Sequence, residues 1–104
     1  MSGQARTVMV RYRVKPDRVE ENLRLVEAVF AELEAARPDG LRYASFRAGL
    51  EFVHVAIIET PDGANPLLAL APFRAFTEAI GERCDQPPEA RDLEQVGGYR
   101  IFAT

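Results

Sequence analysis

Hydrophobic positions along this chain recur with two spacings, the alternation typical of strands and the three-to-four spacing typical of helices. The pattern is strand-like near the start, then helical, strand-like twice, helical again and strand-like at the end. The corresponding ranges are Thr7–Lys15, Arg18–Ala36, Leu41–Ala48, Glu51–Thr60, Phe73–Cys84 and Leu93–Phe102. This order predicts an α+β fold, a four-stranded antiparallel sheet with both helices on one face.

The first strand and the first helix each have one apolar side. The inward face of the strand carries Val8, Val10, Tyr12 and Val14, and its other face carries Met9, Arg11, Arg13 and Lys15. Asp17 is the expected N-cap of the helix, with Glu20 completing a capping box. The expected buried stripe consists of Val19, Leu23, Val26, Phe30 and Leu33. The helix should end at Arg37-Pro38-Asp39-Gly40.

The second half of the chain contains the predicted hairpin, helix and last strand. Gly49-Leu50 suits a tight turn, and residues 52–58 are apolar on both faces, as in a central strand covered on both sides. Pro72 fits the first turn of the second helix, whose apolar face includes Cys84. Gly97-Gly98 predicts a bulge or bend in the last strand.

With both helices on one side, this βαββαβ order, that of ferredoxin-like domains, leaves the other sheet face bare. A chain of 104 residues, expected to be a single domain over 1–104, buries little of its surface on its own. We therefore expect a homodimer in which the 41–60 hairpin and the last strand bury the open face.

Composition excludes several classes of function. A net charge of −3 argues against a nucleic-acid partner, and the scattered basic residues argue against binding to a membrane surface. A single cysteine excludes an internal disulfide and a cysteine-based zinc site. No apolar run approaches the roughly 18 residues of a membrane span, so we expect a cytoplasmic protein.

The chain resembles the antibiotic-biosynthesis-monooxygenase-like (ABM) family of the dimeric α+β barrel superfamily. The resemblance covers about residues 7–102. Its matching segments are Val8–Val14 followed by Lys15-Pro16-Asp17, then Arg37-Pro38-Asp39-Gly40-Leu41-Arg42-Tyr43, Val55-Ala56-Ile57-Ile58-Glu59 and Phe73-Arg74-Ala75-Phe76.

The resemblance implies a dimeric barrel with a pocket between each sheet and its helices. It also implies oxygenase chemistry without a metal, flavin or other cofactor, on a small aromatic or polyketide-like molecule. The haem-degrading members of this superfamily use an asparagine, a tryptophan and a histidine. Here Val10 stands near the place of that asparagine and the chain has no tryptophan, so we do not expect haem degradation.

His54 is the only histidine and the candidate catalytic group, as a general base or as a group that orients a phenolic oxyanion. The alternative is a histidine hydrogen-bonded at the dimer interface. A metal site is not expected, because the remaining ligands would be carboxylates without a recognisable spacing.

The candidate substrate-binding residues are Tyr12, Tyr43, Arg11, Phe30 and Phe76. The tyrosines offer hydroxyls to a ligand, and core packing is their alternative, as it is for the phenylalanines. Arg11, with Arg13, Arg47 and Glu59, either binds an anionic group or forms ion pairs between subunits. Asn22 is expected in solvent, with the mouth of a pocket as its alternative, and Cys84 is expected to be a small buried hydrophobe.

Two functions from different classes remain open, besides the structural possibility of a dimer whose pocket is filled by its own side chains. One is a small cofactor-independent monooxygenase-like enzyme; the other is a non-catalytic dimer that binds a ligand or serves as an accessory subunit.

Overall fold

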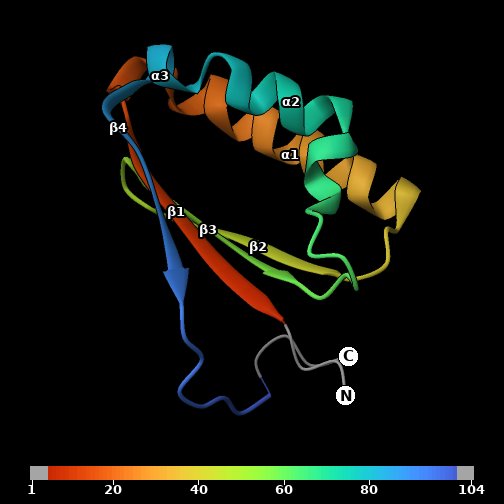
Figure 1. Ribbon diagram of the computed structural model, residues 1–104. Coiled ribbons are helices and arrows are strands. Elements are labelled where there is room, and N and C mark those ends of the chain that lie inside the picture. The colour runs from red at the N-terminus through yellow and green to blue at the C-terminus, as the bar shows by residue number, and fades with distance from the viewer. Residues whose placement is uncertain (1–4, 101–104) are drawn as a thin grey trace.

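The computed structural model describes residues 5–100, which form one sheet with helices on a single face. The strands are β1 (Arg6–Val14), β2 (Leu41–Ala48), β3 (Glu51–Ile58) and β4 (Cys84–Leu93), and all neighbouring pairs are antiparallel. The sheet order is β2-β3-β1-β4. Helices α1 (Val19–Ala36) and α2 (Ala71–Glu78) lie side by side over one face (Figure 1). This confirms the predicted fold class.

The register of the central strands decides which side chains face the helices. Tyr12 on β1 pairs with Phe52 on β3, and Val10 pairs with His54. Side chains of directly opposed residues lie on the same sheet face, so these four face inward. His54 in turn pairs with Ser45 on β2. The inner face therefore brings polar residues from neighbouring strands together beneath the helices.

Helix α1 begins differently from the sequence prediction. A 3-10 turn, η1 (Pro16–Arg18), precedes it, and Arg18 rather than Asp17 is its N-cap. Neither Lys15, the N-cap of η1, nor Arg18, the N-cap of α1, makes a capping hydrogen bond through its side chain, so the predicted capping box is wrong. The end of α1 is as predicted: Arg37 adopts a left-handed conformation at φ 47° and donates its N–H to the carbonyl of Leu33.

The buried side of α1 is rotated relative to the predicted stripe. Its buried residues are Val19, Asn22 and Val29, of which Asn22 is completely buried, whereas Leu23, Val26 and Leu33 are only partly buried. An asparagine thus lies at the centre of the helix–sheet contact. A pattern of apolar residues alone misses it, because the stripe is defined by hydrophobicity.

The predicted second helix, Phe73–Cys84, is broken into α2 and the short α3 (Ile80–Arg83). Pro72 lies in the first turn of α2, as predicted. Arg83 donates from its guanidinium to the carbonyl oxygen of Phe76 at 2.8 Å. That carbonyl would accept the N–H of Ile80 in a continuous helix, so Arg83 replaces the helical bond at the break. Cys84 is buried, but it begins β4 instead of closing the helix.

The last strand is Cys84–Leu93, so the prediction of Leu93–Phe102 is wrong for residues 94–100, and Gly97-Gly98 is not in a strand. Residues 101 and 102 lie outside the described part. β4 is an edge strand that contains Pro87 and Pro88 and is exposed beyond Cys84. Charge and proline are tolerated at a sheet edge, and they remove the alternation from which a strand is predicted.

The sheet face away from the helices has an apolar centre. It is made of the outward residues of the three strands β1, β2 and β3, with one from β4, namely Met9, Ala44, Phe46, Val53, Val55, Ile57 and Leu93. No described element of this chain packs over it, and the side chain of Phe46 is 53% exposed.

Within residues 5–100, no helix combines the length and the apolar character that crossing a membrane requires.

Candidate functional site

An apolar pocket of about 210 Å³ lies between the inner sheet face and the segment that contains α2. Most of its lining is aliphatic or aromatic. The lining residues are Arg6, Val8, Val10, Tyr43, His54, Ala56, Ile58, Asn65, Leu67, Phe73, Phe76, Thr77, Ile80 and Pro88. A largely apolar cavity with a few polar groups is the usual form of a small-molecule site.

His54 and Tyr43 form a polar edge of this pocket. The imidazole is only 4% exposed. Its Nδ1 lies 2.5 Å from Ser45 Oγ and 3.1 Å from the hydroxyl of Tyr43. All three side chains come from β2 and β3, whose pairing places Ser45 directly opposite His54.

The hydrogen bonds continue from His54 away from the pocket. Nε2 of His54 is 2.7 Å from the hydroxyl of Tyr12, which also receives a bond from Nδ2 of Asn22 at 2.9 Å. Asn22 is completely buried, so the expectation that it lies in solvent is wrong. Its amide is the link between the sheet and α1.

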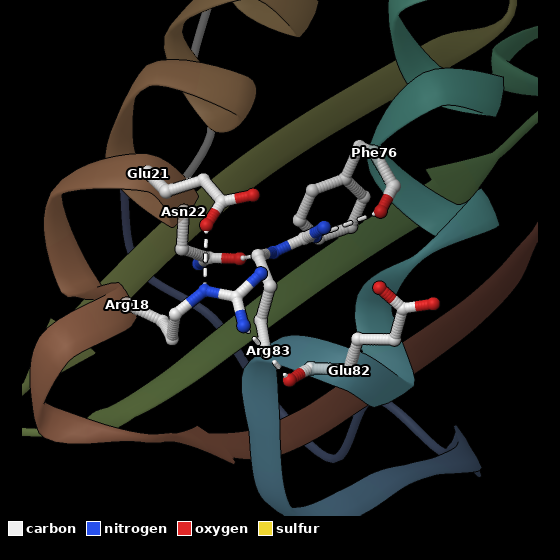
Figure 2. Close-up of polar contacts among 6 residues, drawn as sticks. All are labelled: Arg18, Glu21, Asn22, Phe76, Glu82 and Arg83. Atoms are coloured by element: carbon white, nitrogen blue, oxygen red, sulfur yellow. Dashed lines mark hydrogen bonds and ion pairs between the residues drawn. The ribbon is translucent and has the colours of Figure 1, made fainter.

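Arg83 ends the chain of hydrogen bonds with a buried cation. Its side chain is 1% exposed and donates from Nε to Asn22 Oδ1 at 2.9 Å. Figure 2 shows it reaching between Asn22 on α1 and the Phe76 carbonyl on α2. The guanidinium carbon also lies 5.3 Å from the centre of the Phe76 ring. We call Ser45, Tyr43, His54, Tyr12, Asn22 and Arg83 the buried polar chain.

A surface ion pair closes this region toward solvent. Arg18 Nε and Glu21 Oε1 are 2.7 Å apart, and Arg18 also donates to the carbonyl of Glu82 at 3.3 Å (Figure 2). Burial lowers the pKa of Arg83, while Tyr12 and Glu21 act in the opposite direction. Arginine nevertheless stays charged in proteins, so the chain ends in a fixed set of donors.

Burial also keeps the other titratable members neutral. It lowers the pKa of His54 to about 4 and raises the pKa of Tyr43 to about 12. The pKa of Tyr12 is raised further, again chiefly by burial. At neutral pH the pocket edge therefore consists of the neutral imidazole of His54 and the protonated phenol of Tyr43.

A second, more open groove of about 440 Å³ lies beside the pocket, and Tyr43 lines both. Its other lining residues are Phe30, Leu33, Glu34, Arg37, Pro38, Asp39 and Leu41. The rings of Phe30 and Tyr43 stack at 5.3 Å between centres. Phe30 thus belongs to the groove, whereas Phe76 belongs to the pocket.

The structure separates Arg11 from the other candidate residues. Arg11 lies on the outer sheet face, opposed to Val53, and its guanidinium is 3.5 Å from Glu89. Arg13 and Glu59 also pair at the surface, with Asp85 and Arg42 respectively. Arg47 donates to the carbonyl of Gly49. These charged residues do not line the 210 Å³ pocket.

The sequence predicted Tyr12, Tyr43 and His54 as candidate site residues, but it did not predict Ser45 or Arg83. The position of Ser45 follows from the hairpin, because Gly49-Leu50 sets the register that pairs it with His54. No comparable signal existed for Arg83. It meets Asn22 across 61 positions of sequence, through a break in the second helix that the apolar pattern does not reveal.

Within the described residues, no three His, Cys, Asp or Glu side chains come together in a way that could hold a metal ion.

Several solved structures resemble this one. Rv0793 from Mycobacterium tuberculosis is 18% identical, with a TM-score of 0.74, and the match covers 91% of this chain and 98% of that one. A "Putative antibiotic biosynthesis monooxygenase" from Nitrosomonas europaea is 15% identical over 92% and 94% of the two chains, with a TM-score of 0.74. The chain has the fold of antibiotic biosynthesis monooxygenases. The resemblance drawn from the sequence is thereby confirmed for the fold.

A further structure with that name, antibiotic biosynthesis monooxygenase, is 18% identical over 88% of this chain and 99% of its own, with a TM-score of 0.68. No protein-family model matches the sequence, and no curated protein matches it. The likeness to the antibiotic biosynthesis monooxygenases is thus one of architecture, and the chemistry must be argued from the buried polar chain and the pocket.

The neutral state of His54 predicts a specific pH dependence of stability. A histidine with an ordinary pKa of 6.5 when unfolded and about 4 when folded binds more protons in the unfolded state between these values. Its contribution is therefore complete above pH 6.5 and is lost as the pH falls toward 4. We expect a loss of about 2 kcal/mol by pH 5 and about 3 kcal/mol by pH 4.

Urea unfolding of the wild type and His54→Gln at pH 7 and pH 5 measures this contribution. Glutamine does not titrate, so the stability difference between the two proteins should shrink by about 2 kcal/mol at the lower pH. A difference that stays constant would show that His54 titrates normally in the folded protein.

Proposed function

We propose that this protein binds a small oxygen-bearing aromatic molecule in the 210 Å³ pocket and oxidises it with molecular oxygen, without a cofactor of its own. The observation that carries the proposal is the composition of the pocket. Val8, Ala56 and Phe76 contribute apolar walls, and Tyr43 and His54 form a polar edge. The lining also includes the polar residues Arg6, Asn65 and Thr77. This suits a flat apolar ring system with an oxygen placed at the edge formed by Tyr43.

The proposed reaction uses the substrate as the only reductant. In an enolisable aromatic ketone such as anthrone, the ring methylene that lies across the central ring from the carbonyl loses two hydrogens and becomes a second carbonyl. One atom of O₂ enters that carbonyl and the other leaves as water, so each O₂ accepts four electrons, all of them supplied by the substrate. The proton lost on enolisation passes to solvent, and a hydrogen bond donated to the substrate oxygen stabilises the enolate anion that reacts with oxygen.

The polar edge supplies the hydrogen bond in this scheme. Tyr43 stays protonated at neutral pH, because burial raises its pKa to about 12. Its hydroxyl is therefore a donor for an oxygen that gains negative charge, which is the role of an oxyanion-stabilising group. His54 acts behind Tyr43 and Ser45 rather than on the substrate itself, since both of its ring nitrogens already have partners.

The second candidate is ligand binding without turnover. One observation favours it: burial lowers the pKa of His54 to about 4, which makes the imidazole a weak base at neutral pH. A protein of this kind would hold the same aromatic molecule and pass it on unchanged. The two candidates share the pocket and differ only in whether oxygen is consumed.

Anthrone as substrate and anthraquinone as its stable product separate these candidates. We expect calorimetry to show anthraquinone binding, and we expect one O₂ consumed per anthraquinone formed, faster than the spontaneous oxidation. Ala56→Leu fills the pocket and should remove both binding and turnover. Ala75→Leu, on the exposed side of α2, is the matched control and should change neither.

Binding without oxygen uptake would reject the oxygenase and leave the binding protein. Absence of binding, or equal effects of Ala56→Leu and Ala75→Leu, would reject this pocket as the functional site.

We propose further that two copies of the chain pair through their outer sheet faces. The support is the apolar centre around Val55, on which no described element packs, flanked by charges of both signs such as Arg11 and Glu89. A surface carrying both signs can match a second copy of itself about a two-fold axis. Burial of this face would add hydrophobic stabilisation that a small domain lacks.

Sedimentation at micromolar concentration tests the pairing. We expect a species of twice the 11.6 kDa chain mass for the wild type. Val55→Asp places a charge at the centre of the outer face and should give monomers. Leu68→Asp replaces an exposed apolar residue on the helical side and should leave the dimer intact. A monomeric wild type, or equal behaviour of the two variants, would contradict the pairing.

A further inference from the structure

The hydrogen bonds of the buried polar chain run in one direction, and Arg83 sets that direction. A guanidinium can only donate, so the atom of Asn22 that lies 2.9 Å from Arg83 Nε must be its carbonyl oxygen. The amide nitrogen of Asn22 then faces Tyr12 and donates to its hydroxyl oxygen at 2.9 Å. The orientation of this amide is thus fixed by chemistry.

Asn22 in turn determines where the Tyr12 hydrogen points. The phenol has one hydrogen, and its oxygen already accepts from Asn22. Among the described residues its remaining partner is His54 Nε2, at 2.7 Å. An imidazole hydrogen at Nε2 would leave the buried Tyr12 hydrogen without an acceptor, which is costly. Nε2 is therefore the acceptor, and the neutral His54 carries its hydrogen on Nδ1.

The direction continues to the pocket edge. The Nδ1 hydrogen of His54 is shared by Ser45 Oγ at 2.5 Å and the Tyr43 hydroxyl at 3.1 Å. Because Nδ1 carries the hydrogen, the Tyr43 oxygen is an acceptor on its protein side. The Tyr43 hydrogen can then point toward the pocket that this residue lines.

We infer that Tyr43 presents a hydrogen-bond donor to the pocket, held in that state by Arg83 and Asn22, and that the ligand carries an acceptor oxygen there. The ligand class is accordingly an aromatic ketone, a quinone or a phenolate. This inference rests on the proposed binding pocket and adds the chemical class of ligand that the pocket prefers. Arg83 and Asn22 are positioning residues, since they act through Tyr12 and His54.

Replacing the amide of Asn22 by a carboxylate should reverse the direction of the hydrogen bonds in the buried polar chain. In Asn22→Asp both side-chain oxygens accept, one from Arg83 and the other from the Tyr12 hydroxyl. The Tyr12 oxygen must then accept from His54, which moves the imidazole hydrogen to Nε2. Nδ1 becomes an acceptor for the hydroxyls of Ser45 and Tyr43, so the Tyr43 hydrogen gains a protein partner and is no longer free for the ligand.

Because His54 is the only histidine, long-range proton–nitrogen NMR correlations report its tautomer without ambiguity. We expect the Nδ1–H form in the wild type and in Tyr43→Phe, and the Nε2–H form in Asn22→Asp. A merely structural role of Asn22 would not move the hydrogen. The Nε2–H form in the wild type would overturn the inference.

A matched pair of ligands tests the donor itself. Alpha-tetralone and tetralin share a bicyclic frame, and only the ketone offers an acceptor oxygen. We expect the wild type to bind the ketone about fivefold more tightly. In Tyr43→Phe and Asn22→Asp the ratio should fall to about one, although the tautomer differs between the two variants.

The outcomes separate this inference from the pocket on which it rests. Equal binding of the two ligands to the wild type would overturn the donor role of Tyr43 and leave the pocket in place. Binding of neither ligand would overturn both. Should Asn22→Asp fail to fold, the wild-type tautomer and the Tyr43→Phe ratio still decide the question.

Discussion

The buried guanidinium of Arg83 is the constraint on which the rest of this structure depends. A cation that cannot lose its proton must find acceptors wherever it is removed from water, or the cost of burial is large. Here the acceptors are the side chain of Asn22 and the backbone carbonyl of Phe76. The hydrogen bond to Asn22 connects α3 with α1, and the hydrogen bond to the Phe76 carbonyl replaces a helical bond at the break after α2. One side chain thus fixes the relative positions of three helices above the sheet.

The same cation organises the pocket, although it is not part of the lining. It fixes the amide of Asn22, which fixes the phenol of Tyr12, which fixes the imidazole of His54. These groups bond to one another, and the pocket that His54 and Tyr43 line has mostly apolar walls with an oriented polar edge at Tyr43. A largely apolar site with an oriented donor selects ligands by shape and by the placement of an oxygen.

Much of the architecture could be predicted from the sequence, because strand and helix periods are local signals. The hairpin around Gly49, the end of α1 at Arg37 and the face of β1 that carries Tyr12 follow from such signals. The face on which His54 lies does not, because residues 52–58 are apolar on both sides. The edge strand β4 could not be predicted, since its prolines and charges hide its alternation. Nor could the buried Asn22 and Arg83, because polar residues are expected at the surface and their pairing spans 61 positions.

Arg83 and Asn22 act as one unit in the folded protein, and a double-mutant cycle of unfolding free energies measures their coupling directly. Arg83→Met and Asn22→Leu each leave the partner's buried polar atoms unsatisfied, whereas the double variant removes both groups. We expect the double variant to lose less stability than the two single losses combined, with a coupling of about 1 to 3 kcal/mol. Losses that add to within about 0.5 kcal/mol would contradict it.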